Sequence, residues 1–129
     1  MASSLRVGFL GAGKMAAALA RGLVEGRVLT SAAQIRASCP APDAALLAPF
    51  ADLGCGVTHD NRELARGSDL LMVSVKPNVV PFVLEEVKAE VGDGTKLVVS
   101  IAAGVRLEQL QDMLTPAARV SCCILISTL

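Results

Sequence analysis

VGFLGAGKMA, at residues 7–16, is the most informative stretch of this sequence. It joins an apolar run to an alanine-rich segment in which Leu19 and Leu23 lie four residues apart. Buried strands read as short apolar runs, and amphipathic helices repeat their apolar residues at this spacing. We therefore expect a strand over residues 5–10, a tight glycine turn, and a helix over residues 14–25.

The same stretch contains the pattern G-x-G-x-x-A, formed by Gly11, Gly13 and Ala16. In a strand-turn-helix unit the first residue permits the tight turn, the second lets the backbone approach a pyrophosphate, and the third packs the helix close to the sheet. The helix N-terminus adds unpaired N–H groups and a partial positive charge. The plain alternative is a flexible turn of small residues, but in this context the pattern predicts dinucleotide binding.

The rest of the chain keeps alternating between short apolar runs and helix-like segments. Further strands are predicted over residues 34–38, 56–58, 70–75, 96–101 and 120–126, and helices over 61–66, 81–91 and 107–114. The Ala/Leu-rich segment 43–53 is a doubtful helix because Pro49 interrupts it, and Asn61 is a candidate N-cap. This order predicts an α/β fold, a Rossmann-type, doubly wound and mainly parallel sheet in a single domain over residues 1–129.

Composition excludes several function classes. The 129 residues carry 12 basic and 12 acidic side chains and contain no Trp or Tyr, which argues against a nucleic-acid partner. No apolar run reaches the roughly 18 residues that a membrane span needs. Four cysteines without C-x-x-C spacing and a single histidine, His59, predict free thiols and no metal site. We find no catalytic set of side chains and expect no catalytic role for His59.

The end of the second predicted strand bears on the choice of cofactor. NAD-binding units usually place a carboxylate there, for the adenine ribose, but residues 36–40 read RASCP and contain none. Arg36, Ser38 or the Cys39 backbone is a candidate hydrogen-bond donor to a 2′-phosphate. Alternatively, Arg36 points to solvent and Ser38 only ends the strand. The stretch favours NADP, with NAD as the alternative.

Five segments in order carry a family resemblance: GFLGAGKMA at 8–16, ASCP at 37–40, HDN at 59–61, VKP at 75–77 and VVSIAAGV at 98–105. Together they make the chain resemble pyrroline-5-carboxylate reductase from about Leu5 to Val120. The resemblance implies an N-terminal Rossmann domain that binds NAD(P)H. It also implies an oxidoreductase that transfers hydride to the imine carbon of 1-pyrroline-5-carboxylate, giving L-proline.

Site residues follow from the resemblance, position by position. It implies a phosphate loop, an adenosine and 2′-phosphate region, a contact with the middle of the cofactor, and a nicotinamide-ribose region. These are, in the same order, Leu10, Gly11, Ala12, Gly13, Lys14 and Met15; Ser38, Cys39 and Asn61; Ser74, Val75, Lys76 and Pro77; and Ile101, Ala102 and Ala103. Asn61 as a simple helix cap and Lys76 as a solvated strand-end lysine are the alternatives.

The resemblance ends near Val120. There the family continues into an Asn-Pro loop and a helical domain that forms the dimer and binds the substrate, whereas residues 121–129 read SCCILISTL, a divergent tail. We therefore expect this chain to lack the family's homo-oligomerisation surface and to be weakly active or inactive alone. A non-catalytic NADP-binding module is the alternative function, and a β-hydroxyacid dehydrogenase N-terminal domain is a third, although that family lacks the Ala-Ser-x-Pro signature. The absence of a basic presequence favours the cytosol, with the mitochondrion as the alternative.

Overall fold

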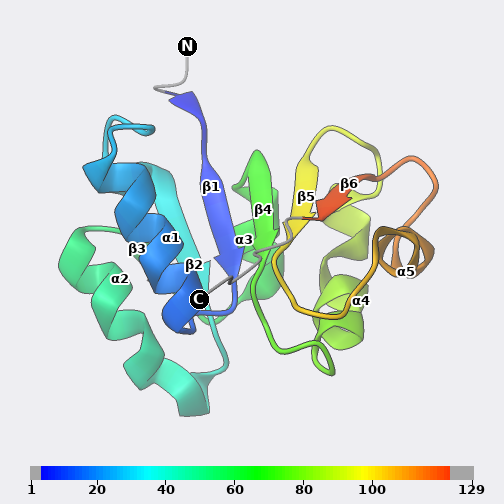
Figure 1. Ribbon diagram of the computed structural model, residues 1–129, viewed down its shortest axis with the longest axis horizontal. Coiled ribbons are helices and arrows are strands. Elements are labelled where there is room, and N and C mark those ends of the chain that lie inside the picture. The colour runs from blue at the N-terminus through cyan, green and yellow to red at the C-terminus, as the bar shows by residue number, and fades with distance from the viewer. Residues whose placement is uncertain (1–3, 123–129) are drawn as a thin grey trace.

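The computed structural model describes residues 4–122, which form a six-stranded, all-parallel sheet in the order β3-β2-β1-β4-β5-β6 (Figure 1). This arrangement confirms the predicted Rossmann-like α/β fold. The strands are β1 (Val7–Leu10), β2 (Ile35–Ser38), β3 (Gly56–Thr58), β4 (Leu70–Val73), β5 (Leu97–Ser100) and β6 (Arg119–Cys122). The helices are α1 (Lys14–Glu25), η2 (Ala32–Gln34), η3 (Ala41–Leu47), α2 (Ala48–Leu53), α3 (Asn61–Arg66), α4 (Val80–Val91) and α5 (Leu107–Met113).

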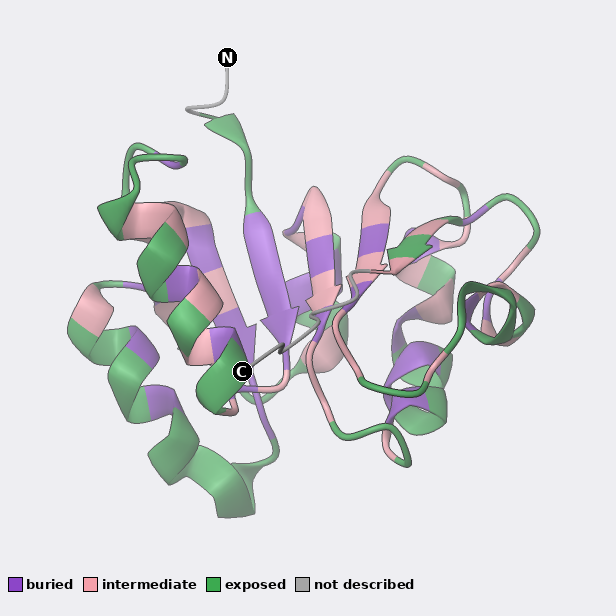
Figure 2. Ribbon diagram, viewed as in Figure 1, coloured by how far each residue is buried: buried purple, intermediate pink, exposed green. Residues whose placement is uncertain are grey.

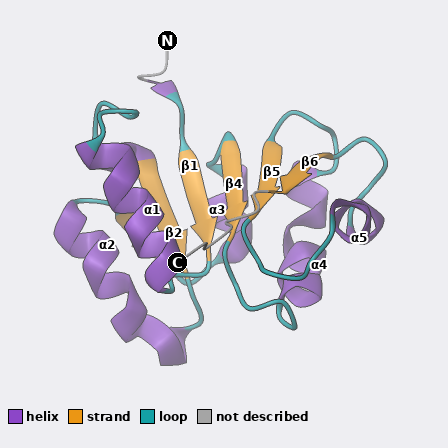
Figure 3. Ribbon diagram, viewed as in Figure 1, coloured by secondary structure: helices purple, strands orange, loops and turns teal. Residues whose placement is uncertain are grey.

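The central strand β1 has both of its faces covered, so it contains only apolar residues and Gly8. Val7 and Phe9 join a core cluster with α1 and α2, whereas Leu10 joins a second cluster with α3, α4 and α5. Figure 3 shows these helices on the two sides of the sheet. The rings of Phe9 and Phe50, 5.8 Å apart, connect β1 to α2. Successive side chains of a strand alternate between faces, so the two clusters follow from the pattern of β1 alone.

The order of strands creates a crevice at one edge of the sheet. From β1 the chain proceeds to β2 and β3 on one side, and then crosses to β4 on the other side of β1. The helices that follow the neighbouring strands β1 and β4 therefore lie on opposite faces of the sheet and diverge at the carboxyl ends of these strands. Open α/β sheets bind ligands at such a switch point.

Several element boundaries differ from the sequence prediction. The segment around Pro49 is helical after all, because Pro49 lies in the first turn of α2, where its missing N–H is not needed. Asp60, and not Asn61, is the N-cap of α3, and its carboxylate accepts hydrogen bonds from the Arg62 and Glu63 amides. The strand predicted over residues 70–75 ends at Val73.

Other boundaries shift by a residue or more. Gln34 belongs to η2 and not to the second strand, because its side chain closes a capping box with Ser31. The last strand begins at Arg119, and the predicted strand residues 123–126 lie outside the described part of the chain. In residues 4–122, no helix has both the length and the apolar character to cross a bilayer, and no group of three or more His, Cys, Asp or Glu is placed to hold a metal ion.

Candidate dinucleotide-binding site

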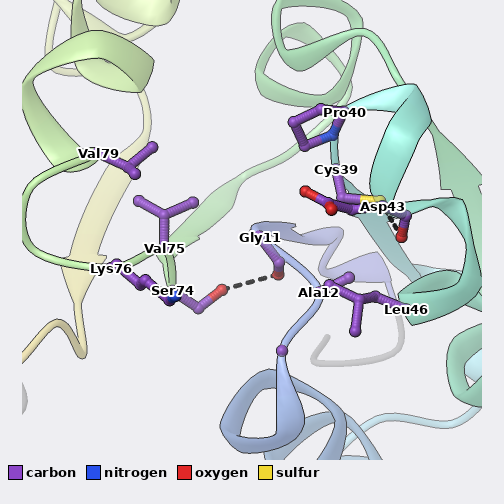
Figure 4. A pocket seen from close by; sticks show the side chains of 11 residues that line it. Gly11, Ala12, Cys39, Pro40, Asp43, Leu46, Ser74, Val75, Lys76 and Val79 are labelled. Carbon is purple, nitrogen blue, oxygen red and sulfur yellow. Dashed lines mark hydrogen bonds between the residues drawn. The ribbon is translucent and has the colours of Figure 1, made fainter.

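A pocket of about 330 Å³ lies at the carboxyl ends of β1, β2 and β4 (Figure 4). The glycine loop, the segment after β2 and the segment after β4 each form one wall. Its lining residues are Gly11, Ala12, Gly13, Cys39, Pro40, Asp43, Leu46, Ser74, Val75, Lys76 and Val79. The structure thus brings together three segments that the sequence assigned to the cofactor.

The first half of the glycine loop is tightly fixed by its neighbours. Gly11 has φ +99°, and its amide donates to the Ser38 carbonyl at 2.9 Å. The Ser74 hydroxyl lies 2.8 Å from the Leu10 carbonyl oxygen and 2.9 Å from that of Gly11. A Cβ on Gly11 would approach the Val75 side chain to 2.8 Å and the Ser74 carbonyl oxygen to 2.9 Å. Only glycine suits this position.

The second half of the loop is open. Gly13 has an ordinary φ of −71° and precedes α1, whose first turn contains no acidic residue. A Cβ built on Gly13 would meet nothing within 4 Å, so the space beside it is free. The first N–H groups of α1 have no partner within the helix and favour negative charge nearby. This free space beside a helix N-terminus fits a pyrophosphate.

The polar side chains at the end of β2 have more hydrogen-bond and ion-pair partners within the protein than the sequence indicated. Ser38 is fully buried, and its hydroxyl donates to Asn61 Oδ1 at 2.6 Å. The side-chain amide nitrogen of Asn61 donates in turn to Glu86 Oε1 at 3.3 Å. The Arg36 guanidinium pairs with the Glu63 carboxylate. These polar groups are therefore already paired with other side chains of the protein, and their contacts with a cofactor stay predictions.

Cys39 and Asp43 form the pocket wall that follows β2. The Cys39 thiol donates to the Asp43 carbonyl at 3.3 Å, and the Asp43 amide donates to the Pro40 carbonyl at 2.9 Å. Burial, and then the nearby Asp43 carboxylate, raise the pKa of the Cys39 thiol. Asp43 was missed as a site residue because it lies beyond the strand end. The signal was its place three residues after Pro40, where a turn returns the chain to the pocket.

The other predicted residues lie near the pocket without lining it. Leu10 is buried beneath the glycine loop, while Lys14 and Met15 are exposed on the first turn of α1. Pro77 is exposed in the connection to α4, and residues 101–103 follow β5 at the same edge of the sheet. Their roles toward a cofactor stay predictions.

The polar character of the pocket is concentrated in a few side chains. Of the lining residues, all within the described part of the chain, Lys76 carries the one positive charge and Asp43 the one negative charge. Figure 4 shows them on opposite walls, with the glycine loop between them. The remaining lining is small or apolar, as in many cofactor sites.

The chain is similar to known NADP-dependent oxidoreductases. Residues 6–104 match the family model described as "NADP oxidoreductase coenzyme F420-dependent". Pyrroline-5-carboxylate reductase 2 of Bos taurus is 40% identical over 123 residues, which cover 93% of this chain and 38% of the relative.

Solved structures of pyrroline-5-carboxylate reductases share the fold of this chain. A pyrroline-5-carboxylate reductase from Coxiella burnetii superposes with a TM-score of 0.81 at 27% identity, over 91% of this chain and 42% of that one. Pyrroline carboxylate reductase of Plasmodium falciparum, solved with NADP bound, has a TM-score of 0.76 at 24% identity, over 92% and 41%. The chain spans about two-fifths of the length of each relative. It belongs to the family of NADP oxidoreductases described as coenzyme F420-dependent, and within it resembles the NADP-binding N-terminal region of pyrroline-5-carboxylate reductases.

Proposed function

We propose that residues 1–129 form one cofactor-binding domain of a pyrroline-5-carboxylate reductase, and that it binds NADPH in preference to NADH. The observation that carries the proposal is the pocket where the glycine loop, the end of β2 and the end of β4 meet. A pyrophosphate would lie beside Gly13 at the N-terminus of α1. Lys76, on the opposite wall, supplies positive charge for the same phosphates.

The reaction is inferred from the relatives. Bound NADPH would supply a hydride, and the relatives' names indicate pyrroline-5-carboxylate as its acceptor. Addition of the hydride to the imine carbon and of a proton to the imine nitrogen would give proline. This chain's contribution is to hold and orient one reactant, and orientation supplies much of the rate of such transfers. Ile101, Ala102 and Ala103, at the carboxyl end of β5, are proposed to lie along the nicotinamide ribose.

The preference for NADPH is supported by the end of β2. No carboxylate stands among residues 36–40, so the strand itself offers nothing that repels a 2′-phosphate. The NADP-bound relative from Plasmodium falciparum supports the same choice. NADH remains the second cofactor to test. A cytosolic location, with the mitochondrion as the alternative, stays a prediction.

The test is a titration with NADPH and then NADH, followed by nicotinamide fluorescence. The sequence has no Trp, so little intrinsic protein emission overlaps the signal. We expect Gly13→Val to weaken binding at least tenfold, since its side chain would fill the free space beside the loop. Gly22→Val is the matched control, because Gly22 lies in α1 outside the pocket lining and a Cβ there also meets nothing within 4 Å.

Equal binding by wild type and Gly13→Val would reject the pocket as the cofactor site. Binding of neither nucleotide by the folded wild type would reject the function. Oxidation of NADPH in the presence of 1-pyrroline-5-carboxylate then separates a reductase from a binding module. For this chain alone we expect binding with little turnover.

A further inference from the structure

The wall of the candidate cofactor pocket contains a carboxylate, although the end of β2 provides none. Asp43 is exposed in η3 and lines the pocket together with Cys39 and Pro40 (Figure 4). These three residues belong to the segment that follows β2, which in dinucleotide-binding folds lies beside the adenine ribose. Asp43 is therefore at the adenosine end of the site.

The backbone of Asp43 is held firmly, while its carboxylate faces the pocket side of the turn. The Asp43 amide donates to the Pro40 carbonyl at 2.9 Å, and its carbonyl accepts from the Cys39 thiol at 3.3 Å. In the described residues, 4–122, no hydrogen bond or ion pair engages the Asp43 carboxylate. Its charge still acts on the adjacent wall, where it contributes to the raised pKa of Cys39.

A carboxylate beside the adenosine ribose acts differently on the two nucleotides. It accepts hydrogen bonds from the 2′-hydroxyl of NADH and repels the 2′-phosphate of NADPH. The groups that would offset this repulsion are occupied, because Arg36 pairs with Glu63 and the Ser38 hydroxyl donates to Asn61. The repulsion from Asp43 is therefore opposed only weakly at this end of the site.

We infer that Asp43 is a specificity-determining residue that limits the preference for NADPH and lets the pocket accept NADH. This inference rests on the proposed function, because it assumes that a nicotinamide adenine dinucleotide occupies the pocket. The 3₁₀ turn after β2 thus supplies, from a different position, the carboxylate that the strand end lacks.

The experiment compares Kd values for NADPH and NADH in wild type, Asp43→Asn and Asp52→Asn, with folding checked by circular dichroism. Asp52→Asn removes the same charge from an exposed position of α2 outside the pocket lining. We expect Asp43→Asn to raise the NADPH-over-NADH affinity ratio by about tenfold, and Asp52→Asn to leave it within twofold. Raising the salt concentration should shrink the effect of Asp43→Asn, because salt screens exposed charges.

The binding measurements distinguish a failure of the Asp43 inference from a failure of the proposed function. If wild type binds both nucleotides and Asp43→Asn leaves the affinity ratio unchanged, the inference is overturned while the function stands. Equal weakening of both nucleotides by Asp43→Asn would assign Asp43 a structural role, and would also overturn it. If folded wild type binds neither nucleotide, the proposed function fails, and the inference fails with it.

Discussion

Two glycines of one loop have different physical roles at the residue scale. Gly11 is needed for its backbone conformation and for the contacts that Val75 and Ser74 already make there. Gly13 has a conformation open to any residue and borders free space. A substitution at Gly11 should therefore damage the fold, whereas one at Gly13 should damage only the site.

We expect Gly11→Ala to lower the free energy of unfolding by about 2 kcal/mol or more, because a positive φ and a collision with backbone act together. Gly13→Ala should change it by less than about 1 kcal/mol. Chemical denaturation followed by circular dichroism measures both values. Similar stability of the two variants would contradict the assignment of separate roles.

The sequence identified the glycine loop from the residue types that a tight turn and close packing require. It assigned the end of β2 from the missing carboxylate, and the end of β4 only through the family resemblance. The structure brings these three segments together around one pocket, and their roles toward a cofactor stay predictions. The sequence did not indicate side-chain partners that come from distant elements. Ser38 donates to Asn61 and Arg36 pairs with Glu63, and neither partner is adjacent in sequence. The turn that returns Asp43 to the pocket is local, and it was missed because Asp43 lies beyond the end of β2.

At the scale of elements, one ion pair joins the starts of β1 and β4. The Arg6 guanidinium donates to both carboxylate oxygens of Asp69, at 2.8 and 3.2 Å, and the Arg6 amide donates to the same carboxylate at 2.9 Å. These hydrogen bonds, the Arg6 side-chain ones above all, lower the pKa of Asp69. The pair therefore stabilises the folded state only while Asp69 is ionised.

We expect Asp69→Asn to cost less than about 1 kcal/mol at pH 7, because the Arg6 and Asp69 side chains are 54% and 40% exposed. The folded pKa of Asp69 is depressed, so its contribution is complete above the ordinary aspartate pKa of about 3.9 and is lost as the pH falls through the folded value. The stability difference between wild type and variant should vanish in acid. Denaturation at pH 7 and near pH 2.5 measures it, with Asp112→Asn in α5 as the control. A difference independent of pH would be the contrary result.

The order and type of the elements followed from periodicity, whereas their ends did not. Apolar runs located the centres of the buried strands β1, β4 and β5, because burial selects those residue types. The last strand was predicted too far along the chain, over 120–126, whereas β6 is Arg119–Cys122. Boundaries depend on single hydrogen bonds, such as those that Asp60 accepts at the start of α3. Pro49 misled the prediction because the same residue breaks a helix interior and suits a helix start.

At the scale of the whole molecule, the two faces of the sheet are covered unequally. Figure 2 shows β1 buried along its length, while buried and half-buried residues alternate along β4 and β5. Met72 and Val99 are paired in the sheet and are only half-buried. On the face that carries Phe9, burial therefore decreases from β1 towards β4 and β5.

Because the pocket is built from segments that follow three strands, a bound nucleotide should stabilise the whole domain. At a free NADPH concentration of 100 times Kd, the free energy of unfolding should rise by about 2.7 kcal/mol. The unfolding temperature should rise by several degrees. Thermal unfolding with and without NADPH tests this, and Gly13→Val should show no shift. A shift of the same size in that variant would indicate binding elsewhere.

The strand order also determines when each edge of β1 can pair during synthesis. During synthesis β1 can pair with β2 soon after both emerge, but its other edge stays open until β4 has been made. Strand β1, which is buried along its whole length in the folded domain, thus waits, half-paired, while the ribosome adds the intervening residues. Nascent chains paused before Leu70 should therefore bind chaperones more strongly than chains that have released β4.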